Sequence, residues 1–311
     1  MTAHDTPAFL PLTGIHEPSA IQQLADGRFL VLEDERQRPF SLVSIASDGG
    51  VDSAPLRPGW LEAWLDSSDD FWKLDDLEGI ALDNAGNIHA VTSHSRDGDG
   101  DERKSRDKLV RFRIEAGRVV APKVVNGLKP ALLAAHPVLE AAAAKREVKR
   151  EGGLNIEALE FGPDGQTLLI GFRSPLLDGR ALIASLENTA EMFDAGAPPR
   201  IAASLITLDL DGDGLRSLSR IPSLGGYLLS SGPVAGGTAH FRLWFWSGIS
   251  GEPAHRVDVA GVPGFERAEG ICPAIIDSQP KIIIVSDDGD HAAGQCARFL
   301  MLDPGQLNIA R

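Results

Sequence analysis

Short hydrophobic runs separated by turns recur along the chain, and each turn is followed by a second run that ends in polar residues. This pair of runs occurs in five degenerate copies, which begin at Ser19, Glu78, Glu157, Arg216 and Glu269. Four of the turns contain glycine, in the pairs Asp26-Gly27, Ala85-Gly86, Asp164-Gly165 and Gly225-Gly226. Glycine adopts a positive φ at little cost, so these pairs favour tight turns between strands. The pattern predicts five β-hairpins.

Further hydrophobic runs extend each hairpin. The third runs are Phe40–Ala46, Leu109–Ile114, Ala181–Leu186, Phe241–Trp246 and Arg298–Leu302. Fourth runs are Val119–Val125, Ser204–Leu210, Arg256–Ala260 and a less certain segment after Val51. Five units of about four strands predict an all-β fold, a five-bladed β-propeller formed by residues 1–311 as a single domain. Pro7–Leu12 is expected to complete the last blade and close the ring. Six blades, or a pair of β-sandwiches, are the alternatives.

The longest interval between copies separates the second from the third. It contains an Ala- and Leu-rich stretch near residues 130–149, a composition of high helix propensity. Proline disrupts a helix interior but is tolerated in the first turn, so a second helix should begin at Pro137. We expect a short helical insertion between blades two and three.

Charge and cysteine content narrow the range of partners. The chain has 44 acidic and 30 basic residues and a net charge of −14, which disfavours nucleic acid and anionic membrane surfaces as partners. Its first residues show no basic and apolar leader, and no run of about eighteen apolar residues occurs. Cys272 and Cys296 alone form no disulfide framework. We expect a cytoplasmic protein with reduced thiols.

Propeller geometry predicts where polar side chains gather. The first strand of a blade leaves one face and the second strand returns to it, so strand starts and strand ends meet around the axis. The first-strand starts contribute Glu78, Asn155, Glu157, Arg216 and Glu269, and the second-strand ends contribute residues 33–36, 93–96, 173–174 and 286–288. Residues 97–107, the insertion, and a loop with Trp60, Trp64 and Trp72 should rim this pocket, the tryptophans either stacking on a ligand or packing the loop.

Three glutamates share one position of the repeat, namely Glu78, Glu157 and Glu269. Like charges that converge on an axis raise one another's pKa, and a hard cation would relieve them. Carboxylates with the amide oxygen of Asn155 suit Ca²⁺ or Mg²⁺. The alternative is that arginines meet the glutamates, with Arg173, Arg216 and Arg267 available.

A second candidate calcium site is the turn that contains Asp209, Asp211 and Asp213. Its D-x-D-x-D-G pattern places oxygens at alternate positions, as in the first half of an EF-hand loop. Arg220 stands where the bidentate glutamate should be, so this is not an EF-hand. Residues 97–102 match the pattern less well, and a solvated turn is the alternative for both segments.

Catalytic and substrate-binding candidates come from the strand ends. His94 could be a general base oriented by Asp287 or Glu78, or simply a hydrogen-bonded residue at the rim. Asp287 and Asp288 are the other candidates for proton transfer. Candidates to bind an anionic small molecule are Arg96, Arg173, Arg216 and Ser174. No G-x-S-x-G elbow, P-loop, dinucleotide fingerprint or zinc-type Cys/His spacing occurs, which argues against those chemistries.

Several segments together carry a family resemblance: EDER, LEGIALD, TSHSR, LNIEALEF, GFRSPLLDGRALI, GLRSL, AEGI and SDDG. From about Gly14 to Leu302, the chain resembles an uncharacterised bacterial family of propeller-like proteins, a domain of unknown function. Its EGI-type strand starts are more weakly similar to the esterase-like phytase propeller family. The resemblance implies a propeller with a charged axial pocket and, in the second case, calcium, but it implies no particular reaction. Ala158 stands where the family pattern more usually has glycine.

Three functional hypotheses follow from these residues. The first is a metal-assisted hydrolase of a small phosphoester, ester or lactone, with the three glutamates on the metal and the arginines on an anionic substrate group. The second is a propeller that binds a ligand or a protein without chemistry. The third is a glycoside-processing enzyme that uses two inward carboxylates. The sequence carries no signal for an oligomeric state.

Overall fold

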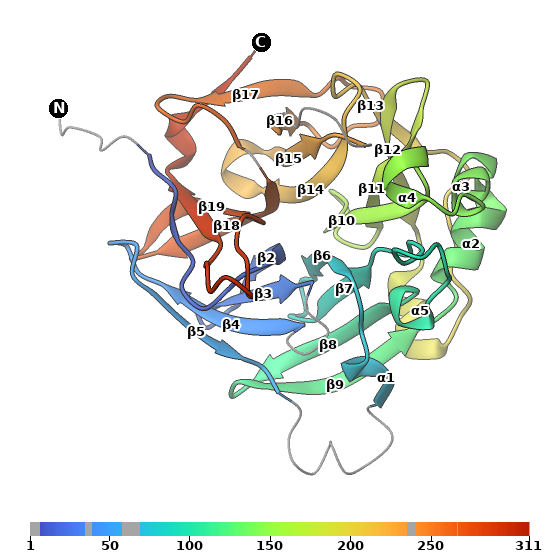
Figure 1. The fold of residues 1–311 in the computed structure, drawn as a ribbon, viewed down its shortest axis with the longest axis horizontal. Coiled ribbons are helices and arrows are strands. Elements are labelled where there is room, and N and C mark those ends of the chain that lie inside the picture. The colour runs from blue at the N-terminus through green and yellow to red at the C-terminus, as the bar shows by residue number, and fades with distance from the viewer. Residues whose placement is uncertain (1–6, 35–38, 58–68, 235–240, 266, 311) are drawn as a thin grey trace.

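The strands form five antiparallel sheets arranged as blades around an axis (Figure 1). The computed structural model describes residues 7–34, 39–57, 69–234, 241–265 and 267–310. Blade one contains β2 (Pro18–Gln23), β3 (Phe29–Glu33), β4 (Phe40–Ile45) and β5 (Val51–Pro55). Blade two contains β6 (Leu77–Leu82), β7 (Ile88–Thr92), β8 (Leu109–Glu115) and β9 (Arg118–Val125). The five-bladed, all-β prediction is confirmed.

The remaining blades follow the same order from the axis outwards. Blade three contains β10 (Asn155–Phe161), β11 (Leu168–Leu177), β12 (Arg180–Leu186) and β13 (Ile206–Leu208). Blade four contains β14 (Gly214–Ile221), β15 (Gly226–Gly232), β16 (Arg242–Trp246), β17 (His255–Val259) and β21 (Leu307–Ile309). Blade five contains β18 (Ala268–Ile276), β19 (Gln279–Ser286), β20 (Arg298–Leu302) and β1 (Leu10–Pro11). The first strand of each blade packs beside those of its neighbours and lines the axis.

Both ends of the described chain complete blades. The N-terminal strand β1 pairs with β20, with Leu10 opposite Phe299, so the predicted closure of the ring is confirmed. Pro11 lies on the outer edge of this sheet, where its missing N–H breaks no ladder. The C-terminal strand β21 was not predicted; it pairs with β17, with Ile309 opposite Val257, and gives blade four a fifth strand.

The hydrophobic core consists of five clusters, each shared by two neighbouring blades. Between blades one and two, Phe40, Phe71 and Phe112 pack with ring centroids 5.1–5.5 Å apart. Phe71 belongs to α1 (Asp69–Trp72), which extends this cluster. Trp72 packs edge-on against Phe40 and Phe71, so it serves the core. Trp60 and Trp64 lie outside the described residues.

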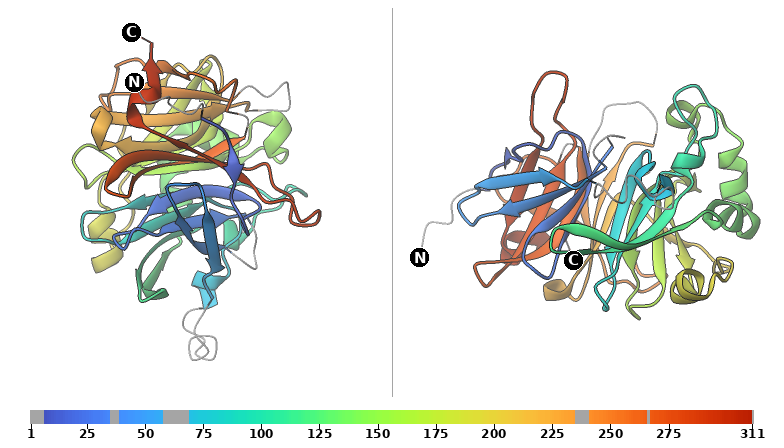
Figure 2. Two further views of the ribbon diagram at one scale, coloured as in Figure 1. Left: turned by 90° about the vertical axis from the view of Figure 1, so that its left-hand side faces the viewer. Right: turned by 90° about the horizontal axis from the view of Figure 1, so that it is seen from below.

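The predicted insertion forms three helices, α2 (Leu128–Ala135), α3 (Pro137–Ala143) and α4 (Val148–Glu151). Pro137 occupies the first turn of α3, as predicted. Figure 2 shows these helices, in green, at the rim of the ring. Three short 3-10 helices, η1 (Lys104–Arg106), η2 (Pro222–Leu224) and η3 (Pro304–Gln306), and one α-helix, α5 (Thr189–Ala195), were not predicted. Cys272 and Cys296 are free thiols. No helix in the described ranges is long and apolar enough to span a bilayer.

Candidate functional site

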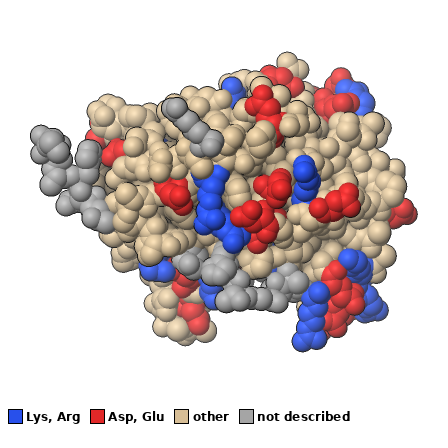
Figure 3. Space-filling model, turned by 90° about the horizontal axis from the view of Figure 1, so that it is seen from above, with Lys and Arg blue, Asp and Glu red and all other residues tan. Residues whose placement is uncertain are grey.

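A cavity of about 750 Å³ lies on the axis. It is lined by residues at the starts of the innermost strands, by part of the 95–100 loop, and by Glu147, Val148 and Arg150 of the helical insertion. The structure therefore brings together residues from all five blades. On the edge of the molecule drawn in Figure 3, by contrast, acidic and basic side chains lie interspersed among other residues.

One local feature recurs at the start of every innermost strand. The register with the second strand shifts at the residues that begin the five sequence copies, which are Ser19, Glu78, Glu157, Arg216 and Glu269. Such a β-bulge leaves one residue unpaired and re-aims its side chain. All five residues line the axial cavity. The repeat in the sequence is thus a repeat of bulges, and each blade presents one residue to the axis.

Glu157 is the most heavily contacted of these carboxylates. Its Oε1 accepts hydrogen bonds from Asn155 Nδ2 at 2.8 Å and from Arg173 Nη1 at 3.2 Å. Its Oε2 lies 3.0 Å from Arg216 Nη1, but that nitrogen donates its hydrogen bond to Glu269 Oε1 at 2.9 Å. The contact with Glu157 Oε2 is therefore an ion pair without hydrogen-bond geometry, and Oε2 has no hydrogen-bond donor within the described residues.

Arg216 lies between two glutamates of the repeat. Burial disfavours its charge, but Glu157, Glu269 and Glu78 outweigh this effect and raise its pKa. Burial, opposed by Arg216, raises the pKa of Glu269 to about 8. An arginine thus stands where the sequence suggested a metal ion. Within the described ranges, no group of three or more His, Cys, Asp or Glu side chains has the geometry to hold a metal.

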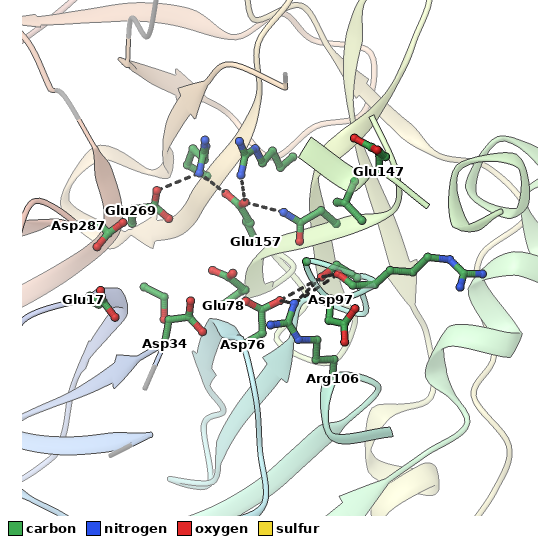
Figure 4. A pocket seen from close by; sticks show the side chains of 18 of the residues that line it. Glu17, Asp34, Asp76, Glu78, Asp97, Arg106, Glu147, Glu157, Glu269 and Asp287 are labelled. Atoms are coloured by element: carbon green, nitrogen blue, oxygen red, sulfur yellow. Dashed lines mark hydrogen bonds and ion pairs between the residues drawn. The ribbon is translucent and has the colours of Figure 1, made fainter. Parts of the chain in front are cut away.

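Glu78 differs from Glu157 and Glu269, because it forms no ion pair or hydrogen bond through its side chain within the described part of the chain. Burial raises its pKa well above the usual range, and repulsion from Glu157, Asp76 and Glu269 adds to the effect. Figure 4 shows Glu78 beside Asp76 and Asp34, across the cavity from Glu269. Glu78 is therefore a carboxyl group that faces the cavity and holds its proton more tightly than an ordinary glutamate does.

A hydrogen-bonded network holds Asp76 next to Glu78. Asp76 has a positive φ of 63°, and its Oδ2 accepts hydrogen bonds from the Ser93 hydroxyl and, at 3.1 Å, from the Ser95 hydroxyl. Arg106 Nη1 lies 2.9 Å from the same carboxylate, and Arg106 Nε donates to Asp75 Oδ2 at 2.9 Å. This network fixes an arginine and a carboxylate at the wall of the cavity.

Three more carboxylates line the cavity from blades one and five, namely Glu17, Asp34 and Asp287. Asp34 is exposed as a whole residue, but desolvation of its carboxyl group and repulsion from Asp76, opposed by Arg106, raise its pKa to about 7. Burial, with repulsion from Glu17, raises the pKa of Asp287. The side of the cavity formed by blades five, one and two is therefore strongly acidic.

Three predicted residues do not line the cavity. His94 has a φ of 56°, and its Nδ1 lies 2.8 Å from the carbonyl oxygen of Thr92, so its ring is held against its own strand. Burial lowers the pKa of His94 to about 4. Ser174 donates its hydroxyl to the Gly153 carbonyl, and Asp288 forms an ion pair with Arg298. The expectation that these three residues face the pocket is wrong, because local partners hold them elsewhere.

Arg96 lines the cavity, but other residues of the protein already contact three of its guanidinium nitrogens. Its Nε donates to the Ala143 carbonyl at 3.1 Å and its Nη1 to the Gly100 carbonyl at 3.2 Å. Its Nη2 lies 3.1 Å from Glu102. Arg96 therefore joins the 97–102 loop to the end of α3 and builds the wall of the cavity.

The aspartate turn of blade four lies apart from the cavity lining. Asp213 Oδ2 lies 2.6 Å from Arg242 Nη1 and accepts a hydrogen bond from Ser231 at 3.2 Å. Asp209 accepts the backbone N–H of Asp211 at 3.2 Å. Arg242 therefore neutralises Asp213, one of the three aspartates of the predicted calcium turn.

Sequence reasoning missed Glu17, Asp76 and Arg106. Glu17 and Asp76 stand two residues before Ser19 and Glu78, the position that Asn155 holds relative to Glu157. Side chains two residues apart point to the same side of a strand, so this spacing could have revealed both acids. Arg106 follows β7 after a long loop, and no spacing in the sequence marks it.

Fold and site together define a five-bladed β-propeller with a charged axial cavity. No family model matches the chain, and no curated protein matches it significantly. A GH43_1 enzyme from Xanthomonas citri complexed with xylose is 13% identical over 98% of this chain and 93% of its own, with a TM-score of 0.52. A GH43 β-1,3-galactosidase with galactodeoxynojirimycin is 13% identical over 96% of this chain and 98% of its own, with a TM-score of 0.51. A gluconolactonase from Xanthomonas campestris is 14% identical over 99% and 92%, with a TM-score of 0.41.

At these identities the likeness concerns the fold. The two GH43 structures share the propeller fold, which agrees with the propeller that the family resemblance implied. The membership in the uncharacterised bacterial family stays a prediction, and the similarity to the phytase family is not confirmed.

Proposed function

We propose that the protein is a hydrolase that cleaves a glycosidic bond of a small polar substrate in the axial cavity. Glu78 is the general acid, and Glu157 is the second carboxylate. The observation that carries this proposal is the contrast between the two residues: Glu78 has no side-chain partner in the described chain, whereas Glu157 is fixed by an amide and two guanidinium groups.

Glycosidic cleavage needs two carboxyl groups close together, one that donates a proton and one that acts as a nucleophile or base. A carboxyl group with a raised pKa protonates the leaving oxygen, and an ionised carboxylate attacks the sugar or activates water. The raised pKa of Glu78 supports the first role, and Glu157 is its strongest electrostatic neighbour. Asn155, Arg173 and Arg216 would orient the Glu157 oxygens for the second role. Two GH43 enzymes with sugar or sugar-like ligands share the fold, which is consistent with this use of it.

The test is a panel of 4-nitrophenyl and alkyl glycosides with Glu78→Gln, Glu157→Gln and Asp52→Asn. Loss of the general acid should slow alkyl glycosides by about 10²–10⁴-fold, and nitrophenyl glycosides much less, because nitrophenolate leaves without a proton. Glu157→Gln should slow both classes. Asp52 is an exposed acid of β5 outside the cavity lining, so its variant should keep full activity. Equal losses for both classes in Glu78→Gln would exclude it as the acid.

Metal-assisted hydrolysis of an ester, lactone or phosphoester is the second candidate. It is favoured by two oxygen acceptors without described partners, Glu78 and the buried Oδ1 of Asn155. Calcium at a hundredfold above its Kd would add about 2.7 kcal/mol to stability, which raises Tm by a few degrees. A calcium-selective rise, with activity lost in EDTA, would favour this candidate. A folded protein that binds sugars but cleaves no glycoside, ester, lactone or phosphoester would instead be the non-catalytic propeller.

A further inference from the structure

Charge is divided unevenly across the axial cavity. In blades three and four, Arg173 and Arg216 contact the carboxylates. Glu17, Asp34 and Asp287, which come from blades one and five, form no ion pair within the ranges that the structure describes. Figure 4 shows Glu17, Asp34 and Glu78 on one side of the cavity and Glu157 on the other. Arg106 attracts Asp34, and Arg267 and Arg216 attract Asp287, but none of them forms an ion pair with these carboxylates in the described chain.

A second observation points to a ligand that donates hydrogen bonds. Asn155 is 7% exposed and lines the same cavity, yet its Oδ1 has no hydrogen-bond partner within the described residues. A flip of the side-chain amide would break the hydrogen bond that its Nδ2 donates to Glu157. A buried acceptor left without a donor is costly, so a ligand that supplies an N–H or O–H group would relieve it.

We propose that the ligand carries a protonated primary amino group on a hydroxylated frame, as in an amino sugar, and that Glu17, Asp34 and Asp287 bind the ammonium. The hydroxylated frame rests on the proposed glycosidic function, whereas the ammonium subsite rests on the three carboxylates without ion pairs and on the unpartnered Oδ1 of Asn155. An ammonium has three N–H donors that diverge, so it matches carboxylates that come from different blades.

Two other cations fit the cavity less well. A metal ion needs carboxylates that close on one point, and no such group exists within the described ranges. A quaternary ammonium is recognised by aromatic faces, and the described residues that line the cavity include no Phe, Tyr or Trp. The lining thus favours a cation that is held by hydrogen bonds to oxygen.

Calorimetric titration with glucosamine, N-acetylglucosamine and glucose tests this proposal. The three probes share their ring, and only glucosamine carries the charge. We expect glucosamine to bind about tenfold more tightly than the neutral sugars at low salt, with the difference reduced about tenfold in Asp34→Asn and in Asp287→Asn. Asp258→Asn removes the same charge from an exposed position on β17 and should leave all three affinities unchanged.

Equal affinities for the three sugars would overturn the proposal, as would an unchanged preference in Asp34→Asn and Asp287→Asn. Binding of Ca²⁺ or Mg²⁺ that depends on Asp34, without binding of glucosamine, would also overturn it in favour of a metal site. The amine preference should persist in Glu78→Gln, which tests binding without catalysis. A protein that prefers glucosamine but hydrolyses no glycoside would therefore contradict only the proposed hydrolase.

Discussion

The same β-bulge occurs on both sides of the axial cavity, but its side chain forms an ion pair on one side and none on the other. In blades three and four, the bulge residues Glu157 and Arg216 contact each other, and Arg216 also binds Glu269. In blade two, the bulge residue Glu78 forms no ion pair in the described chain, and repulsion from Glu157, Asp76 and Glu269 adds to the burial that raises its pKa. An identical β-bulge thus yields either a paired or an unpaired carboxyl group, and a single arginine decides which. Active sites often keep such unfavourable groups at a cost in stability.

Arg216→Ala should have the largest effect on stability. It leaves Glu157 and Glu269 buried with one cationic neighbour fewer, and breaking a buried ion pair from one side costs about 3–5 kcal/mol. Urea unfolding measures this loss. Arg28, whose ion pair with Asp26 is exposed, is the matched control, and Arg28→Ala should cost about 0–1 kcal/mol. Similar losses in both variants would show that Arg216 does not hold the paired side together.

Glu157→Gln and Glu78→Gln should change stability in opposite directions. Glu157→Gln removes the acceptor of Arg173 and the counter-charge of Arg216, which should cost about 1.5–3 kcal/mol. The raised pKa of Glu78 means that burying this carboxyl group costs stability at neutral pH, so Glu78→Gln should stabilise the protein by about 1 kcal/mol or more. Unfolding at one pH measures both. A loss of stability in both variants would mean that Glu78 has a partner and that the contrast between the two sides is false.

The pH dependence of Tm offers a finer measurement of the unpaired side. The pKa values of Glu78 and Glu269 are raised in the folded protein, so the folded state holds these protons more tightly than the unfolded state does. The contribution of these two groups to stability should therefore be complete below 4.5, the pKa of an unfolded glutamate, and should fall as pH rises, for Glu269 towards about 8. Glu78→Gln should make this decline shallower, whereas Asp52→Asn should leave it unchanged. An identical slope in Glu78→Gln and the wild type would contradict the raised pKa.

The sequence predicts the fold well because the repeat is local. Turn glycines and hydrophobic runs mark the hairpins, and the five copies begin at the residues that form the bulges. Closure by β1 follows from one missing strand in blade five. The fifth strand of blade four could not be predicted, because β21 is a three-residue edge strand without a distinct pattern.

The site is predicted less completely because side-chain partners decide it. Glu78, Glu157, Arg216 and Glu269 were placed correctly at the axis by the repeat alone. Whether a glutamate meets an arginine or a metal depends on neighbouring blades, which spacing in the sequence does not reveal. The prediction that His94 faces the cavity is wrong for a local reason. A positive φ and a hydrogen bond with the Thr92 carbonyl oxygen hold its ring against its own strand.

The smallest expected effect is a coupling free energy between Ala158 and Gly171 at the bulge of blade three. After Glu78 and Glu269 come Gly79 and Gly270, which face Val91 and Val285 across the hairpin; after Glu157 comes Ala158, which faces Gly171. In blade three the side chain is on the first strand and the glycine is on the second. A Cβ on Gly171 would lie 2.8 Å from Ala158 Cβ. We expect Gly171→Ala to cost about 1–3 kcal/mol and Ala158→Gly about 0.5–1 kcal/mol. The double variant should cost less than the sum of the two by about 0.5–1 kcal/mol, because Ala158→Gly removes the Cβ that the new side chain of Gly171→Ala would meet. Additive losses in urea unfolding would show that the bulge in blade three is set by something other than this exchange.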